Sequence, residues 1–199
     1  MKIRSRILTL GLLLATIPGV GYGAAAETPA AEAPVPAEWR VHQTLFTYTG
    51  MTSVYSCDGL ESKLKLLLRL AGARPDMKVR ATCSSPSGGP SRLASARLTF
   101  ATLAPSGAPP LPQDADAKTP PPAPEPAVGV WRGVALAARK PFDLDAGDCE
   151  LTEQFERDLL PYFTTRSKDS HFRCIPHQVN FAGIDLKFEV LAPPVAAKK

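Results

Sequence analysis

The stretch Cys57-Asp-Gly-Leu-Glu-Ser-Lys-Leu-Lys-Leu-Leu-Leu-Arg-Leu-Ala-Gly72 predicts an amphipathic helix, and its surroundings decide the fold. Asp58 and Glu61 have the spacing of a capping box, which satisfies backbone N–H groups at a helix start. Gly72 supplies a stop, because glycine readily ends a helix. The apolar residues recur at helical spacing and share one face: Leu60, Leu64, Leu67, Leu68 and Ala71.

The residues around this helix recur later in the chain, in the same order. Trp39-Arg40 returns as Trp131-Arg132 and Cys57 as Cys149, both after 92 residues. Cys83 returns as Cys174 after 91 residues, and Leu103-Ala104-Pro105 as Leu191-Ala192-Pro193 after 88. Four pairs in register indicate a duplicated unit of about 65 residues.

Both copies follow one plan. A β-type run opens each copy, at 39–48 and 131–138, and a helix follows the first cysteine. In the second copy, Pro161 should kink or end the helix early. Two strands complete each copy, at 78–83 and 97–103, then at 171–175 and 185–191.

This order predicts an α+β fold of two tandem β-α-β-β units. Each would be a small, mainly antiparallel sheet with one helix packed on it. The two units could be separate domains or could form one pseudo-symmetric body.

Composition sets the expected boundaries of these units. Residues 1–26 read as a signal peptide, with a basic start, an apolar run from Ile7 to Val20 and small residues before Glu27. The apolar run is shorter than the ~20 residues of a membrane span, so we expect no span after cleavage. The other segments are a tail (27–38), the first unit (39–105), a Pro-rich linker (106–128), the second unit (129–193) and a tail (194–199).

The net charge argues against nucleic acid as a partner. The formal charge of +4 includes Lys2, Arg4 and Arg6, so the chain without its signal peptide carries +1. Charge is nevertheless distributed unevenly: residues 57–83 sum to +3 and residues 143–158 to −6. These segments could face each other or pair chains head to tail, or they could be two solvated helix faces.

The four cysteines predict two disulfides, because an even count in an exported chain is typical of structural bridges. The spacing within a copy is 26 residues in the first and 25 in the second. This symmetry favours Cys57–Cys83 and Cys149–Cys174. Each bridge would contribute about 3–4 kcal/mol on the chain-entropy model.

Enzymatic and metal chemistry receive little support from the sequence. There is no Gly-x-Ser-x-Gly elbow or Cys-x-x-Cys pair, and His42 is expected on the exposed side of a strand. His171 and His177 are weak metal candidates beside Cys174, but a disulfide would remove that thiolate, and a strand would not present all three on one face. Residues 143–148 resemble a calcium loop but lack its ligand pattern. We therefore expect no cofactor and no metal.

The sequence favours an exported protein, periplasmic or secreted, without enzymatic activity. Its role would be binding or structural support in the cell envelope, with an unknown protein or peptide partner recruited by strand addition. The alternative is a periplasmic thiol–disulfide or metal-handling protein that uses Cys149, Cys174, His171 and His177. A small hydrolase is a third possibility.

Overall fold

The structure is a computed structural model that describes residues 33–83, 89–109 and 122–194. In these ranges the chain forms six strands and two α-helices, with short 3-10 turns at Ala146–Asp148 and Leu160–Tyr162. In chain order the elements are β1 (Val35–Thr49), α1 (Cys57–Leu70), β2 (Lys78–Cys83), β3 (Leu93–Pro105), β4 (Glu125–Ala137), α2 (Cys149–Asp158), β5 (Thr165–Phe172) and β6 (Ile184–Ala192).

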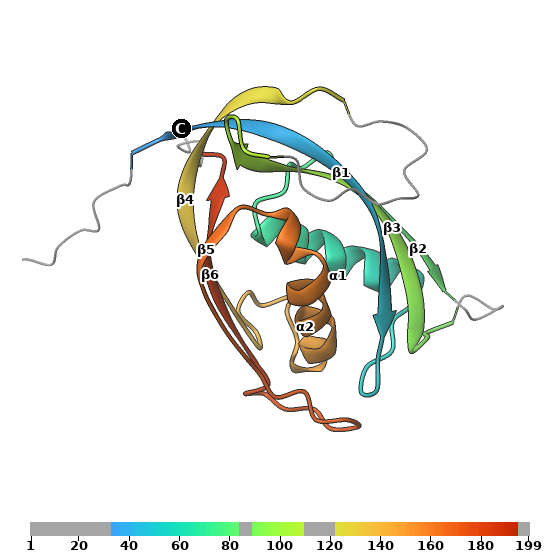
Figure 1. Ribbon diagram of the computed structural model, residues 1–199. Coiled ribbons are helices and arrows are strands. Elements are labelled where there is room, and N and C mark those ends of the chain that lie inside the picture. The colour runs from blue at the N-terminus through green and yellow to red at the C-terminus, as the bar shows by residue number, and fades with distance from the viewer. Residues whose placement is uncertain (1–32, 84–88, 110–121, 195–199) are drawn as a thin grey trace, which may run out of the picture. The chain divides into compact units, whose positions relative to one another are not determined.

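The strands form one antiparallel sheet in the order β2-β3-β1-β4-β6-β5. The α+β class is thus confirmed, with one sheet in place of two small ones. Both halves of the chain belong to a single compact unit, Glu32–Lys199. Both helices lie on the same concave side of the sheet (Figure 1).

The two halves of the sheet meet along a short ladder. Val35–Trp39 of β1 pair with Glu125–Gly129 of β4, and there the pairing of these two strands ends. Beyond it, β1 continues beside β3, and β4 continues beside β6. The sheet is therefore continuous at this junction, and its two halves diverge on either side.

One apolar core fills the space between the sheet and the helices. The expected helix face is buried: Leu60, Leu64, Leu67 and Leu68 of α1 are at most 1% exposed. They pack in one cluster with Leu151 and Phe155 of α2 and with strand residues of both halves. Because each helix covers apolar strand residues that would otherwise face water, burial of this core is the main stabilising term.

A second, smaller cluster lies on the opposite face of the sheet, at the β1–β4 junction. Ala37, Leu103 and Leu191 form its centre, and the two tryptophans pack against it. The guanidinium of Arg74 lies 5.6 Å from the centre of the Trp39 ring, and that of Arg166 lies 4.2 Å from the Trp131 ring. These cation–π contacts cover the junction from the side away from the helices.

Several boundaries differ from the sequence expectation. β1 begins at Val35, inside the expected tail 27–38, and β4 begins at Glu125, inside the expected linker 106–128. These two Pro-containing stretches pair with each other, and residues 37–39 of β1 also pair with β3. The expected signal peptide, the start of the first tail, most of the linker and the final residues 195–199 lie outside the described residues.

The largest difference concerns the strand expected at 171–175. β5 instead spans Thr165–Phe172, and Cys174 lies beyond its end. Residues 165–170, Thr-Arg-Ser-Lys-Asp-Ser, show no alternation of apolar and polar residues, so their pattern does not predict a strand. They form one because β6 offers them a hydrogen-bonding edge, with an irregularity between Arg166 and Asp169. The second helix does end early, at Asp158, before Pro161.

Candidate functional site

The four cysteines form two disulfides, Cys57–Cys83 and Cys149–Cys174, with Cα atoms 5.8 and 5.5 Å apart. These are the pairs that the repeat spacing favours. Each bridge joins the first residue of a helix to the end of β2 or to the residues just after β5. No sulfur is therefore present as a thiolate, the form that attacks disulfides or binds metals.

The structure does not bring the two candidate histidines together with other ligands. His171 lies at the end of β5 with its Nε2 3.1 Å from Asp169, and both side chains are exposed. His177 is exposed in the following loop, where its backbone N–H donates to Thr52 Oγ1 at 3.1 Å. Within the described ranges, no group of three His, Cys, Asp or Glu residues has a spacing that could hold a metal ion.

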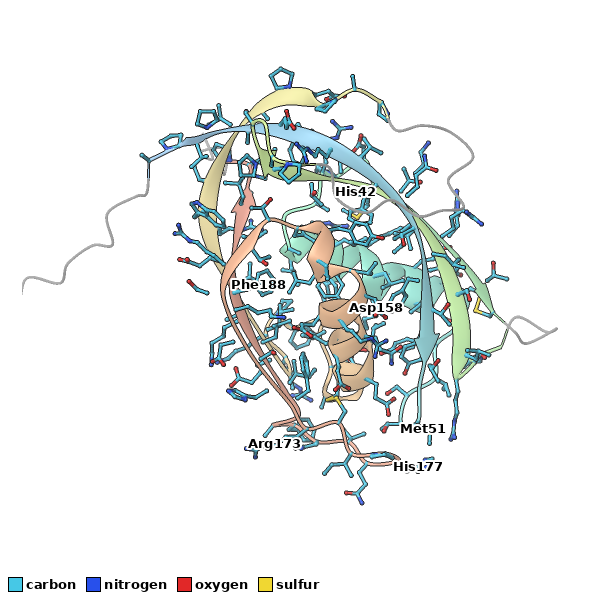
Figure 2. All side chains as sticks on the ribbon, in the orientation of Figure 1. His42, Met51, Asp158, Arg173, His177 and Phe188 are labelled. Carbon is cyan, nitrogen blue, oxygen red and sulfur yellow. A yellow bond between two sulfur atoms is a disulfide. The ribbon has the colours of Figure 1, made fainter. Side chains whose placement is uncertain are left out.

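The expectation that His42 is exposed is wrong. His42 lies on the same face of β1 as Phe46 and Tyr48, which belong to the main core, and it is 5% exposed. Figure 2 labels its position. Its Nε2 lies 2.8 Å from Thr102 Oγ1, and the Phe100 and Tyr162 rings lie beside it. Burial, with a smaller effect of Arg40, lowers its pKa to about 4. Among the described residues, this neutral imidazole has no carboxylate partner to orient it as a catalytic base.

The opposite charges of the two halves meet beneath the sheet. Lys63 of α1 lies 2.6 Å from the carboxylate of Asp148 and 3.1 Å from that of Asp145. Tyr55 donates its hydroxyl to the other oxygen of Asp148. Burial and the Asp148 charge raise the pKa of Tyr55, so its hydroxyl remains a donor.

A second polar network ties the β1–α1 loop to α2. The buried carboxylate of Glu150 accepts from the backbone N–H groups of Met51 (2.9 Å) and Thr52 (3.0 Å). Gln154 accepts from Thr49 N–H and donates to Thr49 O. Because each of these groups already has its partners, the network reads as structural.

Two adjoining cavities share Leu66, Arg69 and Arg139. The first, of about 520 Å³, lies between α1 and residues 139–145. Lys63 and Asp145 of the ion-pair network above also line this first cavity. The second, of about 640 Å³, lies between the end of α1 and β4. We call the two together the α1–β4 groove. The second cavity is lined by Leu66, Arg69, Leu70, Arg132, Gly133, Val134, Ala135, Leu136, Arg139, Lys140 and Pro141.

This groove follows an edge of β4. Five consecutive residues, Arg132 to Leu136, line it. Because successive strand residues point to opposite faces, a groove that touches all five runs along the backbone. Residues 130–136 pair with β6 on one side, and within the described residues no strand pairs with their other side. The backbone groups on that side therefore have no strand partner within the described residues.

The second cavity of the groove is basic, whereas the first is also lined by Lys63 and by the carboxylates of Asp143 and Asp145. Arg69, Arg132, Arg139 and Lys140 line the second cavity, and none of them has an ion-pair partner among the described residues. Arg132 donates to the backbone oxygen of Leu70 at 2.9 Å. Apolar side chains of α1 and β4 form the remaining wall: Leu66, Leu70, Val134 and Leu136.

Sequence reasoning did not find this site. Arg69 and Arg139 are 70 residues apart and lie in different halves of the chain, so no local pattern joins them. Of the groove cations, only Arg132 stands in a motif noted above, the repeated Trp-Arg pair.

Comparisons with known proteins identify no relative: no family model, no curated protein and no solved structure matches this chain. Among the described helices, none is long and apolar enough to cross a membrane.

Proposed function

We propose that this protein is a non-enzymatic binding module of the cell envelope and that its α1–β4 groove binds an extended acidic peptide segment as an added strand. The observation that carries the proposal is that the groove runs along the side of β4 residues 130–136 that has no strand partner among the described residues. Strand addition needs such an edge, because the ligand is held through main-chain hydrogen bonds.

The side chains around the edge define the class of peptide. Four cations without carboxylate partners favour Asp or Glu on the ligand, since guanidinium groups bind carboxylates through paired hydrogen bonds. The apolar wall suits alternate apolar residues, because every second side chain of an added strand faces the same way. The ligand would therefore alternate acidic and apolar residues.

The setting of this binding module follows from other features. The N-terminal pattern and the two disulfides support export, to the periplasm or outside the cell. A duplication is supported by the strand order, which reads β2-β3-β1 from one edge and β5-β6-β4 from the other. The cation–π pairs add to this, since Arg74 over Trp39 and Arg166 over Trp131 are both related by 92 residues.

The alternative of a thiol–disulfide or metal-handling protein has less support. Cys149 and Cys174 are bonded to each other, which leaves the sulfurs without their reactive form. His171 interacts with Asp169, and His177 lies in a separate loop.

Fluorescent peptides of alternating Val and Glu test the proposal by anisotropy, with alternating Val and Lys as the charge control. We expect the Glu peptide to bind and the Lys peptide not to bind. N-methylation of every second backbone nitrogen of the Glu peptide then tests whether the peptide binds as an added strand. Two such peptides are compared, one methylated at the odd positions and one at the even positions. One of them should lose binding and the other should bind nearly as before, because only alternate residues of an added strand donate hydrogen bonds to the edge of β4. Equal effects of both methylation patterns would contradict strand addition.

A matched pair of variants locates the site. Arg69→Gln with Arg132→Gln removes two groove cations, and we expect about tenfold weaker binding or more. Arg92→Gln with Arg97→Gln removes the same charge from exposed positions before and within β3 and should leave affinity unchanged. An equal loss of peptide affinity in both variants would indicate a general effect of net charge and would contradict binding in the groove.

A further inference from the structure

Exposed apolar side chains gather at one end of the structure, on three loops. These are residues 50–56, 138–145 and 173–183, which follow β1, β4 and β5 and which we call the loop end. Among the described residues, nine large apolar side chains are exposed, and six of them are here. The six are Met51, Val54, Phe142, Ile175, Val179 and Phe181. Phe142 and Phe181 stand out, at 81% and 67% exposed.

Hydrogen bonds and a cation–π contact join the three loops into one surface. Thr52 donates its hydroxyl to the backbone oxygen of Ile175 at 3.1 Å and accepts from the N–H of His177. The guanidinium of Arg139 lies 5.9 Å from the Phe181 ring and lines the same cavity as Phe142. Figure 2 shows Met51 and His177 at the same end of the molecule.

The framework beneath this surface holds the loops in place. The Cys149–Cys174 disulfide fixes residues 173–183 to the start of α2. Glu150, the next residue of that helix, accepts from two backbone N–H groups of the first loop. The exposed apolar side chains are thus presented at loop tips by a rigid base, without a partner to cover them in the described chain.

The three loops carry three cations against two carboxylates. Arg139, Lys140 and Arg173 are exposed beside the apolar tips. Residues 50–56 and 173–183 contain no Asp or Glu. In the third loop, the carboxylate of Asp145 pairs with Lys63, which leaves Asp143 as the acidic group without an ion pair there.

From these observations we infer that the loop end binds peripherally to an anionic lipid bilayer. The apolar tips would enter the interface between headgroups and acyl chains, and the three cations would meet lipid phosphates. Apolar side chains on separate projecting loops suit insertion into a lipid bilayer. Lipids can cover each side chain individually, whereas a protein partner would need a surface of matching shape. Phe side chains are among those that bury in this region when proteins bind membrane surfaces.

A flotation experiment with the chain lacking residues 1–26 tests this inference. Vesicles of phosphatidylethanolamine with phosphatidylglycerol supply the anionic surface, and vesicles of phosphatidylethanolamine with phosphatidylcholine supply the neutral one. We expect the protein to float with the anionic vesicles and to remain with the soluble fraction in the neutral case. Absence of flotation with both would overturn the inference.

A pair of double variants distinguishes insertion of the loop-end side chains from nonspecific adsorption of exposed apolar residues. Phe142→Ser with Phe181→Ser should weaken binding to the anionic vesicles about tenfold or more, because two rings no longer leave water. Leu45→Ser with Val128→Ser removes exposed apolar side chains of two strands, 49% and 50% exposed, and should bind as the unaltered chain does. Equal binding by all three proteins would overturn the inference.

A second copy of the chain is the competing occupant. Sedimentation without lipid distinguishes it: a dimer that the Phe142→Ser and Phe181→Ser changes dissociate would assign the loop end to self-association and overturn the lipid inference. A monomer at the concentrations of the flotation supports it. Arg139, Lys140 and Phe142 belong to both the groove and the loop end. The peptide experiment changes only Arg69 and Arg132, which lie outside the loop end, so the two experiments can fail independently.

Discussion

Lys63 of α1 donates to the carboxylate of Asp148, the residue immediately before α2, across a distance of 2.6 Å. These residues come from the two halves of the chain, and Asp148 is nearly inaccessible to water. The pair therefore links the halves under the sheet, next to the hydroxyl of Tyr55.

The first prediction concerns this pair. Lys63→Met should lower the free energy of unfolding by about 2 kcal/mol, because a buried carboxylate loses its cation. Urea denaturation at neutral pH measures the change. Lys65→Met is the control, since its ion pair with Glu61 is a more exposed i,i+4 contact worth at most about 0.5 kcal/mol. Equal decreases in the free energy of unfolding of the two variants would mean that the Lys63–Asp148 pair stabilises the protein no more than a surface ion pair does.

The second prediction concerns pH and His42. Its folded-state pKa of about 4 lies below the ordinary value of 6.5, so the unfolded chain takes up the proton first as the pH falls. Stability should fall from about pH 6.5 to about pH 4, by an amount on the order of 3 kcal/mol.

Comparison of unfolding free energies at neutral and acid pH measures this effect. His42→Gln should reduce the pH dependence, whereas His171→Gln, at an exposed position, should keep it. A His42→Gln protein with the same slope as the unaltered chain would refute the assignment.

The third prediction concerns the disulfides. Digestion under non-reducing conditions, with thiols blocked, should yield linked peptides for Cys57–Cys83 and Cys149–Cys174. Replacement of either pair by serine should cost about 3–4 kcal/mol, because each bridge closes a loop of similar length. Crossed linkages or a blockable cysteine in the mass spectrum would contradict both the structure and the repeat.

The fourth prediction concerns two glycines of β4. A Cβ atom at Gly129 would lie 2.7 Å from Leu191 Cδ1, so Gly129→Ala should destabilise the protein by about 1–3 kcal/mol. At Gly133 a Cβ atom would meet nothing within 4 Å, and Gly133→Ala should be neutral or slightly stabilising. Thermal unfolding of the two variants compares them directly. Similar melting temperatures would show that the junction tolerates a wider separation.

The helices were predictable because their signals are local. Leu60, Leu64 and Leu67 recur at helical spacing after a capping residue, and all three are buried. The capping itself differs in detail: Ser56 Oγ accepts from Gly59 N–H, and Glu61 accepts from Ala81 N–H of β2. The local sequence pattern therefore predicts the helix, whereas tertiary contacts determine which hydrogen bonds its side chains form.

The elements that escaped prediction depend on residues far away in the chain. β5 is a polar strand that exists because β6 offers it an edge. His42 is buried because residues 160–163, more than a hundred positions later, cover its face of β1. The groove likewise joins Arg69 to Arg139 through the packing of α1 beside β4. A single sequence carries no signal for such pairs.

The short ladder between Val35–Trp39 and Glu125–Gly129 has a consequence for assembly. It is the seam between two halves that each keep their own disulfide, and residues 106–124 connect them. Two chains that exchanged halves across this seam would remake every contact within it, which is the requirement for domain swapping. Refolding at high protein concentration would then yield a species of doubled mass that dissociates only when the protein is unfolded.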